Sequence, residues 1–349
     1  MIPAATAPLH TTSLPAAPSP TLPLQPVRWQ RLWREAVRDP GELLAMLGLE
    51  SLASRVSSEA GAQFPLRVPR GFVARMRHGD ANDPLLRQVL PLDEEMRLAP
   101  GFSLDAVGDG AARAGAGLLQ KYRGRALLVA TGSCAVNCRY CFRRHFPYAE
   151  ETAARDGWRE AVQAIRDDTG IEEVILSGGD PLSLATSRLA ELTGALAGIG
   201  HLKRLRIHTR LPMVLPERVD APLLQWLAEL PWPVAVVIHA NHANEFDASV
   251  DSALAGLRDA GARLLNQAVL LRGVNDNVEA LAELGERGFA AGVLPYYLHQ
   301  LDRVAGAAHF EVPDQQAKAL HAALAARTSG YLVPRLVREV AGDPGKRPL

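Results

Sequence analysis

Three cysteines stand within eight residues of one another, and the chain has no others. They are Cys134, Cys138 and Cys141, in the stretch CAVNCRYCFRRHFPY. Three thiolates at this spacing can hold three irons of a cubic four-iron cluster and leave the fourth iron without a protein ligand. A tetrahedral zinc site made by the three cysteines and His145 is the alternative. A disulfide is not expected, because the cysteine count is odd and residues so close in sequence would need a strained bridge.

The residues around the cysteines favour an iron-sulfur cluster over zinc. Arg139, Arg143 and Arg144 supply cations that are expected to lower the pKa of the thiols, and Tyr140 offers an aromatic face beside the last cysteine. An iron with a vacant position can bind a ligand that brings both an amine and a carboxylate. The cysteine window therefore predicts a metal centre that takes part in chemistry.

Composition limits the kind of protein. The chain has 349 residues, is 48% hydrophobic and carries 38 basic and 38 acidic residues, with a pI near 7.2. It shows neither an apolar run of membrane-spanning length nor a signal peptide, so we expect a soluble cytoplasmic protein with no membrane partner. The balanced charge gives no general attraction to nucleic acid, and cysteines confined to one window suit a reducing compartment.

Lysines are scarce, which narrows any covalent chemistry that needs an amine. Only four of the basic residues are lysines. Lys121 and Lys203 precede predicted strands and are expected on the face away from the chemistry, while Lys318 lies in a polar helix. Lys346 stands in AGDPGKRPL, a segment in which neither helix nor strand is expected. Lys346 is therefore the Schiff-base candidate, provided that the tail folds back over the main body.

The pattern along the chain predicts four parts. Residues 1–25 are rich in Pro, Ala, Thr and Ser and are expected to be a disordered tail. Residues 26–105 have helical periodicity and form an N-terminal helical domain, which a linker near 100–110 joins to the main body. Residues 106–300 form the main body, and residues 301–349 form a C-terminal segment that covers its mouth.

The main body alternates apolar strands with amphipathic helices. The strands are expected at 125–130, 173–178, 204–209, 234–240, 263–271 and 293–299. The helices are expected near 158–168, 186–197, 217–229, 248–259 and 278–289. Such alternation predicts a parallel sheet of the α/β class with right-handed crossovers. Six strands favour a partial (β/α)6 barrel that resembles an open TIM barrel, and a flat doubly wound sheet is the alternative.

Unusual polar residues follow every predicted strand. After the first strand comes the cysteine window, and after the others come GGDP (178–181), HTRLP (208–212), HANHANE (239–245), RGVNDN (272–277) and HQLD (299–302). Ligands of parallel α/β folds bind beyond the carboxyl ends of the strands. These residues are therefore expected to converge on one site.

At this point the chain resembles the radical SAM superfamily. Its members carry a CxxxCxxC loop after the first strand and a glycine-rich segment after the second, which match the cysteine window and Gly178, Gly179 and Asp180. The resemblance implies a [4Fe-4S] cluster on Cys134, Cys138 and Cys141 that binds S-adenosyl-L-methionine.

From about Lys121 onward the chain resembles the lysine 2,3-aminomutases in particular. The resemblance rests on CFRR, SGGDPL, LRIHTRLP, NHANE, NQAVLLRGVNDN, PYYLHQLDRVAGAAHF and the terminal GYLVP and GK. It implies an isomerase that also uses pyridoxal 5'-phosphate and moves an amino group between C2 and C3 of lysine.

The resemblance also implies roles for single residues. Lys346 matches the lysine that carries pyridoxal phosphate, and Tyr122, Arg125 and Gln267 match residues around that cofactor. The positions that match S-adenosylmethionine contacts are Tyr140, Gly178, Gly179, Asp180 and His239. The substrate positions are Arg143 for the carboxylate and Asp302 and Glu339 for the ε-ammonium. The catabolic enzymes have aspartate where this chain has Glu339, which keeps the charge on a longer arm.

Within the family the chain resembles the branch that makes (R)-β-lysine for elongation factor P. HFPYAE, HANHANE and DRVAGAAHF favour that branch. The resemblance implies a link to a lysyl ligase that acts on elongation factor P, and an electron donor such as flavodoxin or ferredoxin. Because all three cysteines are used for the cluster, we expect no zinc site.

Other functions remain as alternatives. An aminomutase acting on glutamate or another amino acid is one, although two acids at the distal end of the substrate favour an ammonium group. A radical SAM RNA methyltransferase of the well-known type would need further cysteines. A zinc-containing module that binds RNA or protein belongs to a different class and would contain zinc in place of iron and sulfide.

Overall fold

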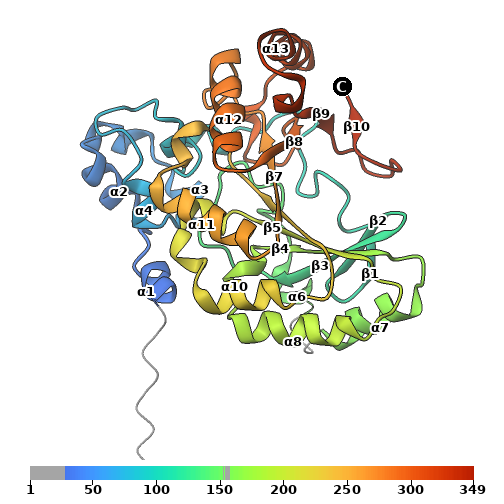
Figure 1. Cartoon of the computed structure of the whole chain (residues 1–349). Helices are drawn as coiled ribbons and strands as arrows, with labels where there is room; N and C mark the ends of the chain where they lie inside the picture. Colours follow the sequence, from blue (N-terminus) through green and yellow to red (C-terminus); the bar gives the residue numbers. More distant parts are fainter. Residues whose placement is uncertain (1–27, 152, 154–157) are drawn as a thin grey trace, which may run out of the picture.

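The computed structural model describes residues 28–151, 153 and 158–349 (Figure 1). The disordered tail predicted for residues 1–25 lies outside these described residues. None of the described helices combines the length and the apolar character that crossing a bilayer requires.

Ten strands form one open sheet in chain order. They are β1 (Arg113–Gly115), β2 (Leu118–Tyr122), β3 (Arg125–Thr131), β4 (Glu173–Gly178), β5 (Arg204–Thr209), β6 (Val234–Ile238), β7 (Arg263–Val269), β8 (Leu294–His299), β9 (Arg335–Arg338) and β10 (Arg347–Pro348). The strands from β3 to β9 pair in parallel, whereas β1 and β2 at one edge and β10 at the other pair antiparallel. Within the described part of the chain β1 and β10 do not pair, so the barrel stays open.

The predicted fold class is confirmed, with more strands than expected. The six predicted strands are β3 to β8, and the sheet is a partial barrel. Their inner residues are apolar because both faces of a parallel sheet are covered. β4, for example, buries Val174, Ile175 and Leu176 in succession. The sequence pattern missed β1, β2, β9 and β10.

Helices lead from one parallel strand to the next and cover the outside of the sheet (Figure 1). They are α6 (Tyr148–Glu151), α7 (Arg159–Asp167), α8 (Thr186–Ala197), α9 (Leu211–Val214), α10 (Ala221–Ala228), α11 (Ala248–Asp259), α12 (Val278–Ala290) and α13 (Asp314–Arg327). Short 3-10 turns lie at η4 (Pro181–Ser183), η5 (Pro216–Arg218), η6 (Ala243–Glu245), η7 (Ala308–Phe310) and η8 (Gly330–Leu332). The five predicted helices correspond to α7, α8, α10, α11 and α12.

Polar caps fix where three of these helices begin. The side chains of Asp220, Asp247 and Asn277 accept hydrogen bonds of 2.8 to 3.0 Å from backbone N–H groups in the first turns of α10, α11 and α12. Such caps satisfy donors that a helix leaves without an internal partner. The third predicted helix therefore starts later than expected, after η5 and Asp220.

Before the sheet, the chain forms a group of short helices. They are α1 (Arg28–Arg34), α2 (Pro40–Leu47), η1 (Glu50–Arg55), α3 (Ser58–Gln63), α4 (Arg70–Val73), α5 (Pro84–Arg87) and η2 (Asp93–Met96). One cluster of buried apolar side chains runs without a break from Trp29 in α1 through the strands to Leu336 in β9. The boundaries at 105 and 300 stay predictions, and the core is shared across both.

The C-terminal segment adds two strands, and β10 lies in AGDPGKRPL, where neither helix nor strand was expected. β9 extends the parallel sheet beyond β8, and β10 pairs with β9 through Arg347 opposite Arg338 and Pro348 opposite Val337. A proline is tolerated in such an outer strand, because its missing N–H is not needed by a further neighbour. The expectation for the AGDPGKRPL segment was therefore wrong, since β10 starts directly after Lys346. Figure 1 shows β9 and β10, in red, across the sheet from the blue N-terminal helices.

Candidate functional site

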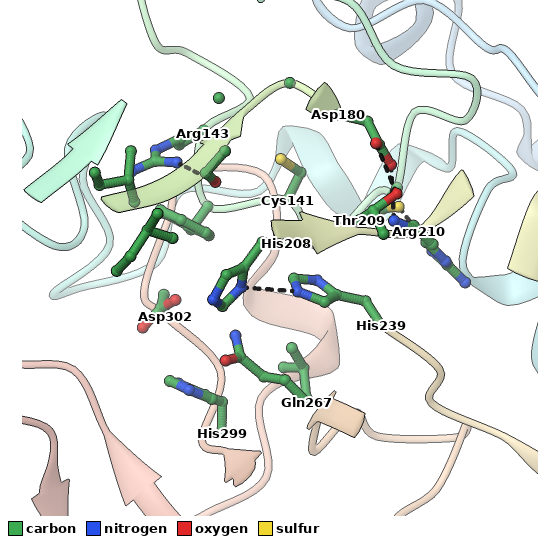
Figure 2. A pocket seen from close by; sticks show the side chains of 18 of the residues that line it. Cys141, Arg143, Asp180, His208, Thr209, Arg210, His239, Gln267, His299 and Asp302 are labelled. Carbon is green, nitrogen blue, oxygen red and sulfur yellow. Dashed lines mark hydrogen bonds between the residues drawn. The ribbon is translucent and has the colours of Figure 1, made fainter. Parts of the chain in front are cut away.

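A cavity of about 230 Å³ lies at the carboxyl ends of the parallel strands. Its walls include every residue that the sequence analysis proposed for the site: Tyr122, Arg125, Cys134, Cys138, Tyr140, Cys141, Arg143, Gly178, Gly179, Asp180, His239, Gln267, Asp302, Glu339 and Lys346. Figure 2 shows several of these side chains around one space. The side-chain amine of Lys346 and the three thiols therefore line the same cavity. This position meets the condition that the tail folds back over the main body.

The cysteines lie in the loop that follows β3. The Cys141 N–H donates to the Cys138 carbonyl at 3.0 Å, and the Arg67 guanidinium donates to the Cys134 carbonyl at 3.0 Å. Among the described residues, no three His, Cys, Asp or Glu side chains converge on a point that one ion could occupy. The ring of His145 contacts the Ala305 carbonyl instead, at 3.0 Å.

Arg143 and Arg144 lower the pKa of the Cys141 thiol, as expected, but burial has the larger effect. Burial raises the pKa of the Cys141 thiol to about 11 and outweighs the nearby Arg143 and Arg144. Burial, followed by the charges of Asp180 and the other thiols, also raises the pKa of Cys134 well above its ordinary value. A bound metal centre would add positive charge that favours the thiolate form of these side chains.

Two of the expected cations are used to anchor the loop. Arg139 and Arg144 both contact the carboxylate of Glu95 in η2, at 2.6 and 2.7 Å from its Oε2 atom, and the three side chains are at most 1% exposed. Opposite charges so deeply buried must stay paired, because removing one partner costs about 3–5 kcal/mol. This triad fixes the cysteine loop to the N-terminal helices.

The glycine-rich segment after β4 packs directly on the start of the cysteine loop. Gly179 and Asp180 donate backbone hydrogen bonds to the carbonyls of Thr131 and Ser133, at 2.6 and 2.8 Å. Gly178 has φ +114, and a Cβ atom there would lie 2.5 Å from the Thr131 carbonyl oxygen. Glycine is therefore required for this close approach.

The Asp180 carboxylate is occupied by the protein itself. It accepts hydrogen bonds from the Thr209 hydroxyl at 2.7 Å and from the backbone N–H groups of Leu182, Arg210 and Leu211 (Figure 2). The side chain thus ties the end of β4 to the end of β5. Only the backbone around Asp180 is left to face a ligand.

A buried polar network surrounds Tyr140. Its hydroxyl accepts hydrogen bonds from Arg210 at 2.8 Å and Asn241 at 2.7 Å. The Arg210 guanidinium also donates to the Cys138 sulfur at 2.7 Å and to Gln88 Oε1 at 2.7 Å, and it pairs with Glu245 Oε2 at 3.1 Å. This network joins the cysteine loop to the ends of β5 and β6 and to the N-terminal helices.

Across the cavity, the tail presents Lys346 beside two acids. Lys346 Nζ lies 2.8 Å from Glu339 Oε2. Burial would raise the pKa of Glu339, but Lys346 and Lys121 outweigh it and lower this pKa to about 2. Burial, reinforced by the charge of Glu339, raises the pKa of Asp302 to about 7.

Lys121 lies in the site, against expectation. It belongs to β2, and its Nζ atom is 2.7 Å from Asp109 Oδ1 and 2.9 Å from Glu339 Oε1. The prediction that it faces away from the chemistry was therefore wrong. β2 turns back antiparallel onto β3, with Tyr122 opposite Arg125, so the segment runs along the sheet edge beside the cavity.

Buried polar atoms without a protein partner gather near Lys346. They are the Tyr122 hydroxyl, Gln267 Oε1, His299 Nε2 and Asp302 Oδ1, none of which has a hydrogen-bond partner among the described residues. Arg125 stacks over the Tyr122 ring at 4.5 Å from its centroid. Buried polar groups are normally satisfied, so these atoms indicate a polar ligand at this end of the cavity.

Three histidines line the middle of the cavity. His208 Nδ1 and His239 Nε2 are 3.2 Å apart, and His299 lies near them (Figure 2). Burial lowers the pKa of His239 to about 4 and lowers those of His208 and His299 well below the ordinary range. All three rings are therefore neutral at physiological pH.

Sequence reasoning did not assign a role to several residues that line or brace this site. They are Asp109, Lys121, His208, Arg210 and His299. His208, Arg210 and His299 stand in HTRLP and HQLD at strand ends, which is the signal that could have found them. Asp109 lies in a glycine-rich segment and carried no such signal.

Comparisons with known proteins agree with this geometry. Residues 128–285 match the family profile of the radical SAM superfamily. The chain is 47% identical over 322 residues to the L-lysine 2,3-aminomutase of Escherichia coli (strain K12), covering 92% of this chain and 94% of that protein. It is 45% identical to the enzyme of that name from Haemophilus influenzae, covering 93% and 98%. It is 32% identical to that of Clostridium subterminale, covering 91% of this chain and 77% of that one.

Proposed function

We propose that this chain, which belongs to the lysine 2,3-aminomutase family of the radical SAM superfamily, converts L-α-lysine into (R)-β-lysine by moving the amino group from C2 to C3. The chain is an isomerase. The observation that carries the proposed chemistry is the cavity in which three thiols face the amine of Lys346.

The reaction needs three cofactors. A [4Fe-4S] cluster with S-adenosyl-L-methionine supplies a carbon radical that takes hydrogen from the substrate, and pyridoxal 5'-phosphate supplies the aldehyde that carries the migrating nitrogen. Cys134, Cys138 and Cys141 would hold the cluster. Two sets of residues would line the other cofactors: Tyr140, Gly178, Gly179, Asp180 and His239 for S-adenosylmethionine, and Tyr122, Arg125, Gln267 and Lys346 for pyridoxal phosphate.

Features of the cavity support both assignments. The open Tyr122 hydroxyl and Gln267 Oε1 suit a cofactor with many polar atoms. Gly178 and Gly179 bring bare backbone to the cavity wall next to the cysteine loop. Asp180 would act by joining β4 to β5, because its carboxylate is already occupied. The neutral His239 can share hydrogen bonds without adding charge.

Charged side chains at the two ends would orient the lysine substrate. Arg143 offers the planar donor geometry that matches a carboxylate. Asp302 and Glu339 would receive the ε-ammonium, and Glu339 already binds an ammonium group, that of Lys346.

The same acids argue against an aminomutase that acts on glutamate. Asp302 and Glu339 line the cavity together, and a distal carboxylate on the substrate would be repelled by both. A substrate with a distal ammonium group is attracted by both. Lysine is therefore the proposed substrate.

An anaerobic assay tests the whole proposal. Protein reconstituted with iron and sulfide is incubated with reductant, S-adenosylmethionine, pyridoxal phosphate and L-lysine, and the product is separated by chiral chromatography. We expect (R)-β-lysine. A reconstituted enzyme that leaves lysine unchanged, or that converts only glutamate, would disprove the proposal.

Borohydride reduction identifies the amine that carries pyridoxal phosphate. Reduction fixes the cofactor to its lysine, and the labelled peptide is found by mass spectrometry. We expect the label on Lys346. Lys121 is the competing amine, because it lies on the same carboxylate of Glu339. A label on Lys121 would reverse the assignment and leave the overall reaction standing.

The product would serve the modification of elongation factor P. This proposal rests on the motifs HFPYAE, HANHANE and DRVAGAAHF, and it includes a cytoplasmic location, a lysyl ligase that uses the product, and flavodoxin or ferredoxin as electron donor. Adding the enzyme, lysine and cofactors to the ligase and elongation factor P is expected to raise the mass of the factor by one β-lysyl group. A mass gain that does not depend on the aminomutase would contradict it.

A further inference from the structure

Asp109 is a buried acid in the segment that joins the N-terminal helices to the sheet. Asp109 is 2% exposed, and each of its two carboxylate oxygens lies close to a different cation. Oδ2 lies 2.7 Å from Arg143 Nε, and Oδ1 lies 2.7 Å from Lys121 Nζ. Burial would raise the pKa of Asp109, but the two cations outweigh it, so this pKa is lowered and the group is charged.

The backbone around Asp109 is held by hydrogen bonds to Asp105 and by close packing of Gly108 on the tail. Asp105 accepts hydrogen bonds from the N–H groups of Asp109 and Gly110, each at 2.9 Å. Gly108 has φ +69 and packs so closely on the tail that a Cβ atom there would lie 2.8 Å from the Ala341 Cβ. The segment near residues 100–110, which was predicted to be a linker, therefore packs against the C-terminal segment beside the sheet.

Asp109 is the second of five side chains in a row of alternating charges. The row runs from Arg143 through Asp109, Lys121 and Glu339 to Lys346, and its contacts are 2.7 to 2.9 Å long. Arg143 is the proposed partner of the substrate carboxylate, and Glu339 is a proposed partner of its ammonium. The row therefore joins the two ends of the proposed substrate site through protein alone.

Asp109 also decides which edge of Arg143 faces the cavity. It occupies the Nε side of the guanidinium, and among the described residues the terminal nitrogens meet one hydrogen-bond acceptor, Ser177 Oγ at 3.2 Å. A guanidinium can offer its two terminal N–H groups to a carboxylate as a fork. Without Asp109, the positive charges of Arg143 and Lys121 would lie near each other without the anion between them.

We propose that Asp109 is a positioning residue that holds Arg143 and Lys121 at a set separation and thereby selects amino acids whose carboxylate and distal ammonium are one lysine chain apart. The inference rests on the proposed function, because it uses the same substrate. It adds a specificity-determining residue outside the set that the family resemblance supplied.

The test is the Asp109→Asn variant of the reconstituted holoenzyme. Steady-state kinetics with L-lysine and with L-ornithine, one methylene shorter, is compared with the original enzyme. Loss of charged hydrogen bonds is expected to raise KM for lysine by about 10- to 100-fold, far more than kcat falls. The preference for lysine over ornithine is expected to fall as well. Iron content and the visible absorbance of bound pyridoxal phosphate are expected to stay unchanged.

Asp105→Asn is the matched control, because it changes a neighbouring acid that braces the backbone without touching Arg143 or Lys121. It is expected to keep KM and substrate preference. An unchanged KM and preference in a fully loaded Asp109→Asn enzyme overturns the inference, and so does an equal loss in both variants. If the original enzyme does not turn lysine over, the proposed function itself fails.

A charge-compensated variant covers the case in which Asp109→Asn does not fold. Asp109→Asn combined with Lys121→Met removes one buried anion and one buried cation together. This double variant is expected to retain iron and to show the raised KM, because Arg143 has lost its brace. A folded double variant with the original KM and preference for lysine would refute the inference.

Discussion

The two ends of the cavity are built in contrasting ways. At the cluster end, which comprises the cysteine loop and its supports, the carboxylates of Glu95, Asp180 and Glu245 are all bound by protein donors. At the tail end, which comprises β2, β9, β10 and the residues they face, Tyr122 and Asp302 keep buried polar atoms open in the described structure. Buried Arg144 Nε and Arg210 Nε at the cluster end also lack partners among the described residues, so the contrast concerns the acids: those of the cluster end are satisfied by protein donors, and Asp302 at the tail end is not.

The contrast indicates what each end does. Satisfied buried networks rigidify a structure, because breaking any member leaves another group unpaired. The cluster end therefore holds its loop in place before any cofactor arrives. The tail end holds charges that can exchange one ammonium for another on Glu339, which suits a site where amines must enter and leave. Substitutions at the cluster end should damage stability, and those at the tail end should damage turnover.

Lys346→Ala is expected to have the largest effect on turnover. Removing the proposed carrier amine should abolish β-lysine formation, while iron content and unfolding free energy stay near those of the original protein, because Glu339 keeps its ion pair with Lys121 when Lys346 is lost. Product formation, bound iron and urea unfolding measure the three quantities. Lys318→Ala, an exposed lysine in α13, is the control, and full activity in Lys346→Ala would contradict the assignment.

Glu95→Gln is expected to have the largest effect on stability. It leaves Arg139 and Arg144 without their buried anion, which should lower the free energy of unfolding by about 3–5 kcal/mol and reduce the iron bound per chain. Urea unfolding and iron analysis test this. The neighbouring Glu94→Gln loses a more exposed pair with Arg55 and should cost less than about 1 kcal/mol. If Glu95→Gln and Glu94→Gln lowered the unfolding free energy equally, the buried triad would not be what stabilises the cluster end.

The acidity of Asp302 predicts a pH dependence confined to the tail end. Burial raises its pKa to about 7, so the group is neutral below that pH and binds the substrate ammonium weakly there. KM for lysine should fall by up to about tenfold per pH unit as pH rises toward the pKa, and then level off. Asp302→Asn should remove this slope. A KM that is flat across neutral pH in the original enzyme would show that Asp302 does not bind the ammonium.

A matched pair of tyrosines gives the smallest and sharpest test. Tyr140→Phe removes the acceptor for Arg210 and Asn241 and should lower the unfolding free energy by about 1–3 kcal/mol. Tyr122→Phe removes a hydroxyl that has no hydrogen-bond partner among the described residues, so it should cost almost nothing without cofactors. Urea unfolding of the cofactor-free proteins compares them. A larger loss in Tyr122→Phe would reverse the contrast.

The parts of the fold that sequence could predict are those governed by local pattern. β3 to β8 are buried on both faces, so each is a continuous apolar run bounded by turn residues. β2 was missed, although the turn after it carries a sequence signal. Arg123 and Gly124 form a two-residue hairpin loop between β2 and β3, and Gly124 has φ +80. β9 and β10 are short and become strands by pairing, β9 with β8 and β10 with β9.

The site could be predicted where its residues stand at the ends of strands. It could not be predicted where charged side chains, which are usually exposed, are buried in ion pairs. Arg139 and Arg144 were expected only as cations beside the thiols, but both are buried and bound to Glu95. Their partner Glu95 lies more than forty positions away in sequence, at a separation of 44 from Arg139. Lys121 and Asp109 were missed for the same reason, since Lys121 pairs with Glu339 and Asp109 with Arg143, both far away in sequence. Long-range ion pairs leave no periodic trace in a sequence.

The contact of Gly108 with Ala341 has a consequence for engineering. The two positions lie on segments far apart in the chain, and a methyl group added at Gly108 would meet the Ala341 methyl at 2.8 Å. The segment around Gly108 and the segment around Ala341 are therefore packed against each other so closely that a change in one must be matched in the other. A chimera that grafts the tail of a homologue onto this barrel, to alter which amino acids it accepts, should be made by exchanging both segments together.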